Sequence, residues 1–118
     1  MSEAVSWVLE LAVKDSQLNA FKALAQEMSE ATQDEPGATH YEWYIDADGK
    51  NIHIFERYAD SAATMVHLGN FGAKFAERFL ACVDPTRFMV YGDPSAEVRG
   101  AVAGLGAVHM TQFVGFAR

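Results

Sequence analysis

The sequence predicts an α+β fold in which a small antiparallel sheet carries two helices on one face. Residues 5–13 alternate between apolar and other side chains, as in a strand with one buried face. Two more alternating runs flank Asp48-Gly49, a dipeptide typical of β-hairpins. Apolar residues at helical spacing follow both the first run and the hairpin, so helices and strands are interleaved.

The composition indicates one folded domain, residues 1–118, with a core at about 5–91 and a C-terminal extension at 93–118. Half of the residues are hydrophobic, and the formal net charge is −7. That charge disfavours nucleic acid and anionic membranes as partners, because both attract basic surfaces. The single cysteine, Cys82, excludes a disulfide within the chain. No leader-like or membrane-length apolar stretch is present, so we expect a soluble, cytoplasmic protein.

The first strand and helix follow from the spacing of apolar residues. Asp15 or Ser16 is a candidate N-cap for a helix that starts at Gln17. This helix should end before Glu35-Pro36-Gly37, because a proline disfavours helical backbone in the residue before it. The strand is expected to bury Val5, Trp7, Leu9, Leu11 and Val13, and the helix Leu18, Phe21, Leu24, Ala25 and Met28.

The hairpin around Asp48-Gly49 predicts a register. A two-residue turn pairs Ala47 with Lys50, and therefore Trp43 with Ile54. One face then carries Tyr41, Trp43, Ile45, Ile52, Ile54 and Glu56, and the other carries His40, Glu42, Tyr44, His53, Phe55 and Arg57.

Asp60-Ser61 is the expected N-cap of the second helix. Gly69 and Gly72 predict a break, with a further helical segment from about 73 to 83, because glycine is unfavourable inside helices. A fourth strand should follow at 86–91, then a helix that starts at Asp93-Pro94 and ends by Gly104 or Gly106. A last strand is expected at 107–117. The buried stripe of the second helix is Met65, Leu68, Phe75, Phe79 and Cys82.

This order of elements spells a ferredoxin-like βαββαβ plait with an extra C-terminal helix and strand. Both faces of its strands carry bulky apolar groups, whereas two helices cover only one face. A second copy of the chain is the simplest cover for the other face, so we predict a homodimer packed sheet to sheet. The residues on opposite faces are Trp7 and Val8, Trp43 and Tyr44, Ile54 and Phe55, and Phe88 and Met89.

The stretches Tyr41-Glu42-Trp43-Tyr44 and Phe55-Glu56-Arg57-Tyr58, followed by a helix with His67-Leu68 and Phe71, resemble the antibiotic biosynthesis monooxygenase (ABM) family. The resemblance covers roughly residues 5–91 and implies a dimeric α+β barrel. Relatives include cofactor-independent quinol or anthrone oxygenases, haem-degrading enzymes, isomerases and members without known activity. In the haem-degrading relatives an axial histidine lies where this chain has Glu77, which is a poor substitute.

The resemblance implies a monooxygenase that needs neither cofactor nor metal and oxidises a small aromatic, quinol-like substrate with O2. His67 would remove a phenolic proton, with Glu56 as the second catalytic residue. Trp43, Tyr41 and Phe71 would bind the substrate in a pocket between sheet and helices. Other interpretations stay open for the same residues: a hydrogen-bonded helix residue for His67, a core residue for Trp43, a structural carboxylate for Glu56. An isomerase or lyase on this scaffold, or a non-catalytic ligand-binding module, are the alternative functions.

Overall fold

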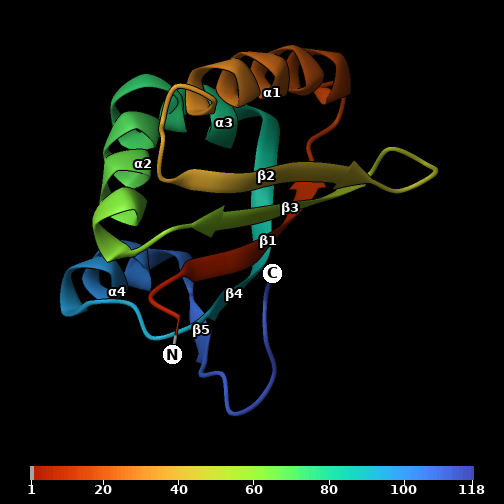
Figure 1. The fold of residues 1–118 in the computed structure, drawn as a ribbon. Coiled ribbons are helices and arrows are strands. Elements are labelled where there is room, and N and C mark those ends of the chain that lie inside the picture. Colours follow the sequence, from red (N-terminus) through yellow and green to blue (C-terminus); the bar gives the residue numbers. More distant parts are fainter. Residues whose placement is uncertain (1) are drawn as a thin grey trace.

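The computed structural model describes residues 2–118 and has helices packed against one face of a five-stranded sheet (Figure 1). The strand order is β2-β3-β1-β4-β5, and all neighbours are antiparallel except β4 and β5. The predicted ferredoxin-like α+β fold is confirmed. The strands are β1 (Val5–Val13), β2 (Ala38–Ile45), β3 (Asn51–Tyr58), β4 (Val83–Tyr91) and β5 (Val108–Met110). The helices are α1 (Leu18–Thr32), α2 (Ser61–Lys74), α3 (Ala76–Cys82) and α4 (Ala96–Val102), the last continued by a 3₁₀ turn at Ala103–Leu105.

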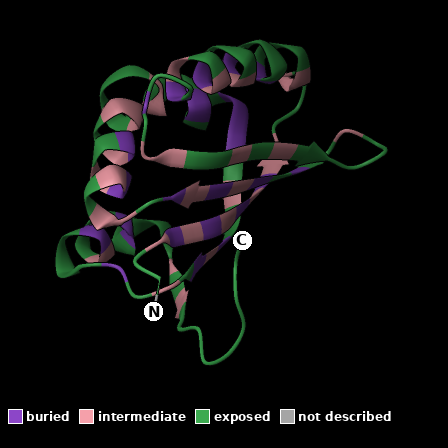
Figure 2. Cartoon of the chain, viewed as in Figure 1, coloured by how far each residue is buried: buried purple, intermediate pink, exposed green. Residues whose placement is uncertain are grey.

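The hydrophobic core lies between the sheet and the helices (Figure 2). Every second residue of β1 from Val5 to Leu11 is buried, as the alternation predicts. These side chains meet Phe21, Leu24 and Met28 of α1. Burying one such side chain stabilises the fold by about 1.5–3 kcal/mol, so this interface holds the helices on the sheet. Cys82 is also buried there.

The hairpin register is confirmed, but the turn differs from the prediction. Trp43 pairs with Ile54 and Tyr44 with His53, as expected. The Gly49 amide donates to the Asp46 carbonyl, and the Asp46 amide donates to the Asn51 carbonyl. The connection is therefore a four-residue loop rather than a two-residue turn, with Gly49 at a positive φ of 73°. The Asp46 carboxylate favours this loop because it accepts from the Lys50 and Asn51 amides.

The break in the second helical region lies later than the glycines predict. Gly69 and Gly72 both lie inside α2, which ends at Lys74, and Phe75 separates it from α3. A Cβ at either glycine would meet nothing within 4 Å, so these positions face open space. Packing of the opposite side of α2 on the sheet outweighs the roughly 1 kcal/mol that each glycine costs.

Two of the three predicted helix caps are wrong. The α1 helix begins at Leu18, and Gln17, rather than Asp15 or Ser16, occupies the N-cap position without a side-chain hydrogen bond. Ser16, just before it, has a left-handed φ of 65°. Ser95, not Asp93, caps α4 by accepting from the Val98 amide. The Asp60 cap of α2 is confirmed, since its carboxylate accepts from the Ala63 amide at 2.8 Å.

The C-terminal region contains much less strand than predicted. Only Val108–Met110 pair with β4, and residues 111–118 are exposed and outside any strand. They form an arm that leaves β5 and turns back toward the sheet (Figure 1). Conversely, β4 begins at Val83, three residues before the expected start, and accommodates Pro85 next to an irregularity at Glu10 and Leu11. No helix in the described part of the chain has the length and apolarity needed to cross a membrane.

Candidate functional site: a buried histidine between two carboxylates

A group of polar side chains is buried between α2 and the sheet. Burial of polar groups costs free energy unless each finds a hydrogen-bond partner. Hydrophobic packing does not explain why five polar residues are buried close together in this core. They are Thr32, Glu35, Glu56, Thr64 and His67, each no more than 9% exposed.

His67 is at the centre of this group, and both of its ring nitrogens face a carboxylate. Nδ1 lies 3.1 Å from Glu35 Oε1, and Nε2 lies 3.3 Å from Glu56 Oε1. Glu35 also accepts from Asn70 Nδ2 at 3.3 Å, one turn further along α2. A neutral imidazole donates from one nitrogen only, whereas an imidazolium donates from both. The geometry therefore favours the protonated form of His67.

The electrostatics of His67 point the same way. Burial disfavours the charged ring, but the hydrogen bond and charge of Glu56 and the charge of Glu35 together outweigh burial. The pKa of His67 is therefore raised above its ordinary value of 6.5. An imidazolium between two carboxylates amounts to one net negative charge for the three groups.

Two tyrosines enclose the histidine. The Tyr58 hydroxyl donates to Glu56 Oε1 at 2.5 Å, and its ring lies 4.9 Å from the His67 ring at 32°. The Tyr41 ring meets His67 edge-on at 5.4 Å. Burial, followed by the negative charge of Glu56, raises the pKa of both hydroxyls far above the usual range. Both tyrosines therefore remain hydrogen-bond donors at any physiological pH.

The turn that carries Glu35 is held against α2 by a close contact. The Glu35 carbonyl accepts from the Ala38 amide, and the Gly37 carbonyl accepts from the Ala59 amide. A Cβ on Gly37 would overlap the Ala63 Cβ, so only glycine allows this approach. Ala63 is one helical turn before His67, so the contact places Glu35 within reach of the histidine.

The structure brings together most of the predicted site residues. His67, Glu56 and Tyr41 are in contact, and Trp43 packs on Tyr41 with ring centres 5.5 Å apart. Phe71 lies one turn along α2 from His67 and packs edge-on against Phe79 at 5.2 Å, within the core.

Sequence reasoning missed Glu35 and Tyr58. Glu35 was assigned only to the end of the first helix, because it precedes Pro36-Gly37. The one available signal was a carboxylate beside a proline–glycine turn. Its partner, His67, is thirty-two positions away, so the sequence does not show the pairing. Tyr58 was visible as the final residue of an alternating strand, two positions after Glu56 and therefore on the same face.

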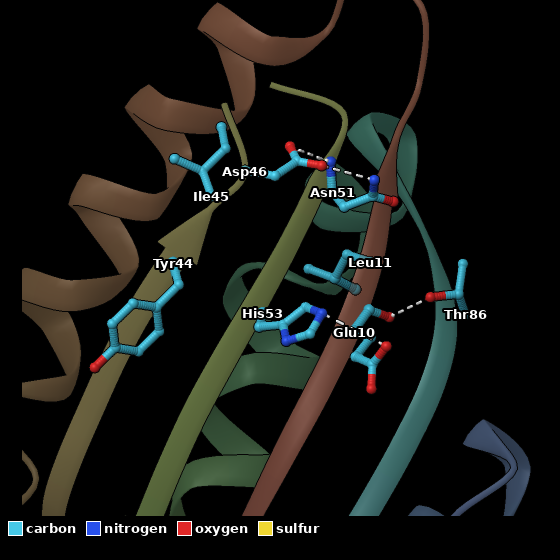
Figure 3. Close-up of a pocket in the computed structure, with 8 residues that line it drawn as sticks. All are labelled: Glu10, Leu11, Tyr44, Ile45, Asp46, Asn51, His53 and Thr86. Carbon is cyan, nitrogen blue, oxygen red and sulfur yellow. Dashed lines mark hydrogen bonds and ion pairs between the residues drawn. The ribbon is translucent and has the colours of Figure 1, made fainter. Parts of the chain in front are cut away.

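The clearest hollows in the described chain lie away from His67. One, of about 460 Å³, is on the sheet face turned away from the helices (the outer face), where Glu10, Tyr44 and His53 point into it (Figure 3). Another, of about 320 Å³, lies between the start of α1 and the hairpin loop. The open pocket expected under the helices is not among them, and the interface around His67 is packed, with His67 5% exposed.

The sequence pattern of the family described as antibiotic biosynthesis monooxygenase matches residues 4–84, more than half of the chain. The chain belongs to the ABM family. The match agrees with the predicted resemblance and includes β1 to the end of α3. No curated protein sequence matches the chain.

Solved structures share the ABM fold. MupZ from Pseudomonas fluorescens has a TM-score of 0.88 at 23% identity and covers 99% of this chain and 96% of its own. SnoaB from Streptomyces nogalater, described as a cofactor-independent oxygenase, has a TM-score of 0.68 at 13% identity and covers 80% and 97%. Rv0793 from Mycobacterium tuberculosis has a TM-score of 0.59 at 27% identity and covers 78% and 96%. Of these three, only MupZ spans nearly the whole chain, including the C-terminal extension.

Proposed function

We propose that this ABM-family protein is a cofactor-independent monooxygenase that acts on a small aromatic, quinol- or anthrone-like substrate. The observation that carries the proposal is His67, buried between Glu35 and Glu56. Membership of the family and the similarity in fold to SnoaB, a cofactor-independent oxygenase, support the class of reaction. His67 and Glu56 are the proposed catalytic residues, and Tyr41, Trp43 and Phe71 are proposed to bind the substrate.

The chemistry requires a proton acceptor next to an aromatic ring. Two carboxylates and one imidazolium carry a net negative charge. With the His67 ring protonated, the carboxylate of Glu56 rather than the imidazole is the group that would take a proton from an acidic C–H or O–H. The resulting anion passes one electron to O2, and the radical pair combines to a peroxide. Return of the proton releases water, so that a ring methylene and O2 become a ring carbonyl and water. The protein binds the substrate, removes its proton and shields the anion from water, and the anion itself supplies the electrons to O2.

Substrate binding requires the packed interface to open. Tyr41 and Trp43 are only partly buried, and both are on β2, which is the edge strand of the sheet. Ligand entry at this edge needs movement of side chains between β2 and α2, rather than of the central strands. Flat rings suit this place because the residues around it are aromatic.

Oxygen uptake tests the proposal. Purified protein with anthrone, without added flavin or metal, should consume one O2 per substrate above the enzyme-free rate. His67→Gln should reduce the rate by about 10²–10⁴-fold, the usual contribution of a general acid or base. His40→Gln is the matched control, because His40 is exposed, hydrogen-bonds to its neighbour Thr39 and lies on the face of the sheet away from His67. An uptake rate equal to the enzyme-free rate, with folded protein, rejects the oxygenase.

An isomerase or lyase is the second candidate, and the raised pKa of His67 favours it. A protonated imidazole can donate a proton, and the carboxylates beside it can accept one, in a reaction that needs no O2. Turnover under nitrogen that is lost in His67→Gln would select this candidate. Thermal stabilisation by aromatic ligands without any turnover would instead indicate a binding module.

We also infer that the protein works as a homodimer. In the single chain, Val8, Phe55 and Met89 on the outer face are only half-buried. The C-terminal arm exposes Phe113 by 95%, together with Val114 and Phe116. Apolar side chains exposed on this scale favour a partner surface. Sedimentation at micromolar concentration should give twice the 13.0 kDa mass of the chain, and a particle of 13.0 kDa would contradict the dimer.

A further inference from the structure

Trp43 carries a buried N–H group that has no hydrogen-bond partner within residues 2–118. Its indole Nε1 is one of two buried side-chain polar atoms without a partner; the other is His109 Nδ1. An indole nitrogen is a donor only, in every protonation state, so no change of tautomer relieves it. A histidine nitrogen can exchange its donor and acceptor roles. Trp43 is therefore the stronger indication that a partner is absent.

Unpartnered donors of this kind are uncommon, because a buried N–H that loses water without gaining an acceptor costs free energy. Buried tryptophans normally direct this group to an acceptor. This cost is present at Trp43 although its ring packs on Phe21 and Tyr41. An acceptor oxygen on a bound ligand would remove the cost.

The position of Trp43 indicates what such a ligand would be. Its ring packs between Phe21 of α1, at 5.7 Å, and Tyr41, at 5.5 Å. Tyr41 in turn lies 5.4 Å from His67, so a row of rings runs from the unpartnered N–H to the proton-accepting group. A flat ligand that enters here when the packed interface opens would meet aromatic faces and one hydrogen-bond donor.

We propose that Trp43 Nε1 donates a hydrogen bond to a carbonyl or phenolate oxygen of a bound aromatic ketone or quinol. This inference rests on the proposed function and specifies its substrate. The acidic C–H or O–H of the substrate would lie at His67 and Glu56, and an oxygen conjugated with it would lie at Trp43. When the acidic group loses its proton, negative charge spreads through the ring to that oxygen. The donor then stabilises the anion more than the neutral substrate, which lowers the barrier to deprotonation.

Binding of two probes of equal shape tests the donor without requiring turnover. 1-Tetralone has an aromatic carbonyl, and tetralin lacks only that oxygen. The wild type should bind 1-tetralone more tightly than tetralin by calorimetry. Trp43→Phe keeps a ring but removes the N–H, so it should weaken 1-tetralone about tenfold, the usual range for one neutral hydrogen bond, and leave tetralin unchanged. Tyr44→Phe is the control, because Tyr44 lies on the same strand but faces outward.

A second measurement separates a ligand donor from a structural one. Trp43→Phe shortens a ring that packs on Phe21 and Tyr41, so its own midpoint should fall; the informative quantity is the rise in thermal midpoint that 1-tetralone causes in each protein. The rise should be larger in the wild type than in Trp43→Phe, and an equal rise in both would mean that the N–H serves the fold and would overturn the inference. Equal weakening of both probes, or no binding of 1-tetralone to the wild type, would overturn it as well. Failure of O2 uptake alone would reject the oxygenase while leaving a Trp43-dependent preference for 1-tetralone intact.

Discussion

His67 Nε2 lies 3.3 Å from Glu56 Oε1, and the two side chains reach each other from facing elements, α2 and β3. Both are almost fully buried, so solvent screens this pair very little. The contact holds α2 on β3, and it is strongest when the His67 ring carries its second proton. Stability and any proton-transfer chemistry should therefore depend on the same group.

Removal of the Glu56 charge should be strongly destabilising. Glu56→Gln leaves the His67 imidazolium with one carboxylate partner and replaces the charged acceptor of Tyr58. Breaking a buried ion pair typically costs about 3–5 kcal/mol of unfolding free energy. Urea unfolding at pH 7 measures this. Glu27→Gln is the control, because its ion pair with Arg78 is exposed and screened by solvent, so its loss should lower the unfolding free energy far less. Equal losses in the two variants would contradict the role of Glu56.

The contribution of His67 to stability should fall as the pH rises, because its pKa is raised in the folded protein. Folded His67 binds its proton more tightly than the unfolded chain does, so its contribution is fully present below pH 6.5. It is lost as the pH rises through the folded pKa. The difference in unfolding free energy between wild type and His67→Gln should therefore be larger at pH 6 than at pH 9. A constant difference for His67→Gln would count against the ion pairs.

The contact between Gly37 and Ala63 should be sensitive to a single methyl group. Gly37→Ala places a Cβ in a position that Ala63 already occupies, and overpacking of this kind costs about 1–3 kcal/mol. Gly69→Ala is the control, because that site is open and helical, and the change should stabilise by about 0.5–1 kcal/mol. Ala63→Gly combined with Gly37→Ala should recover much of the loss. Denaturant midpoints without that recovery would mean that the contact does not position the turn.

Much of the fold followed from local patterns. The alternation around Asp48-Gly49 was sufficient for the register of Trp43 with Ile54, because a one-residue slip of one strand would have put these two side chains on opposite faces of the sheet. The Asp60 cap was also recognisable, since it directly precedes an apolar helical stripe. The helix break was misplaced because propensity at Gly69 and Gly72 was overridden by packing on the sheet.

The candidate site was only partly predictable. His67, Glu56 and Tyr41 could be placed together from strand phase and helix position. Glu35 could not, because its carboxylate reaches His67 through a turn whose approach depends on the absence of a side chain at Gly37. The strand expected at 107–117 was predicted from alternation alone, but β4 offers pairing only to Val108–Met110.

The two candidate caps at the starts of the first helices give a matched pair of variants. Asp60→Ala removes a carboxylate that accepts from the Ala63 amide, so it should cost about 0.5–2 kcal/mol of unfolding free energy. Asp15→Ala should change stability by less than about 0.5 kcal/mol, because α1 has no side-chain cap. Thermal or urea unfolding compares the two. A larger loss at Asp15 would contradict the described start of α1.

The most direct test of the proton-sharing site is an NMR titration of the histidine rings, with His67 assigned by its absence in His67→Gln. Glu35 and Glu56 should hold both ring nitrogens of His67 protonated to a pH above 6.5, and Glu56→Gln should lower that midpoint. A His67 ring that is already neutral at pH 6 in the wild type would show that burial dominates over the carboxylates, and the proposed proton transfer would lose its basis.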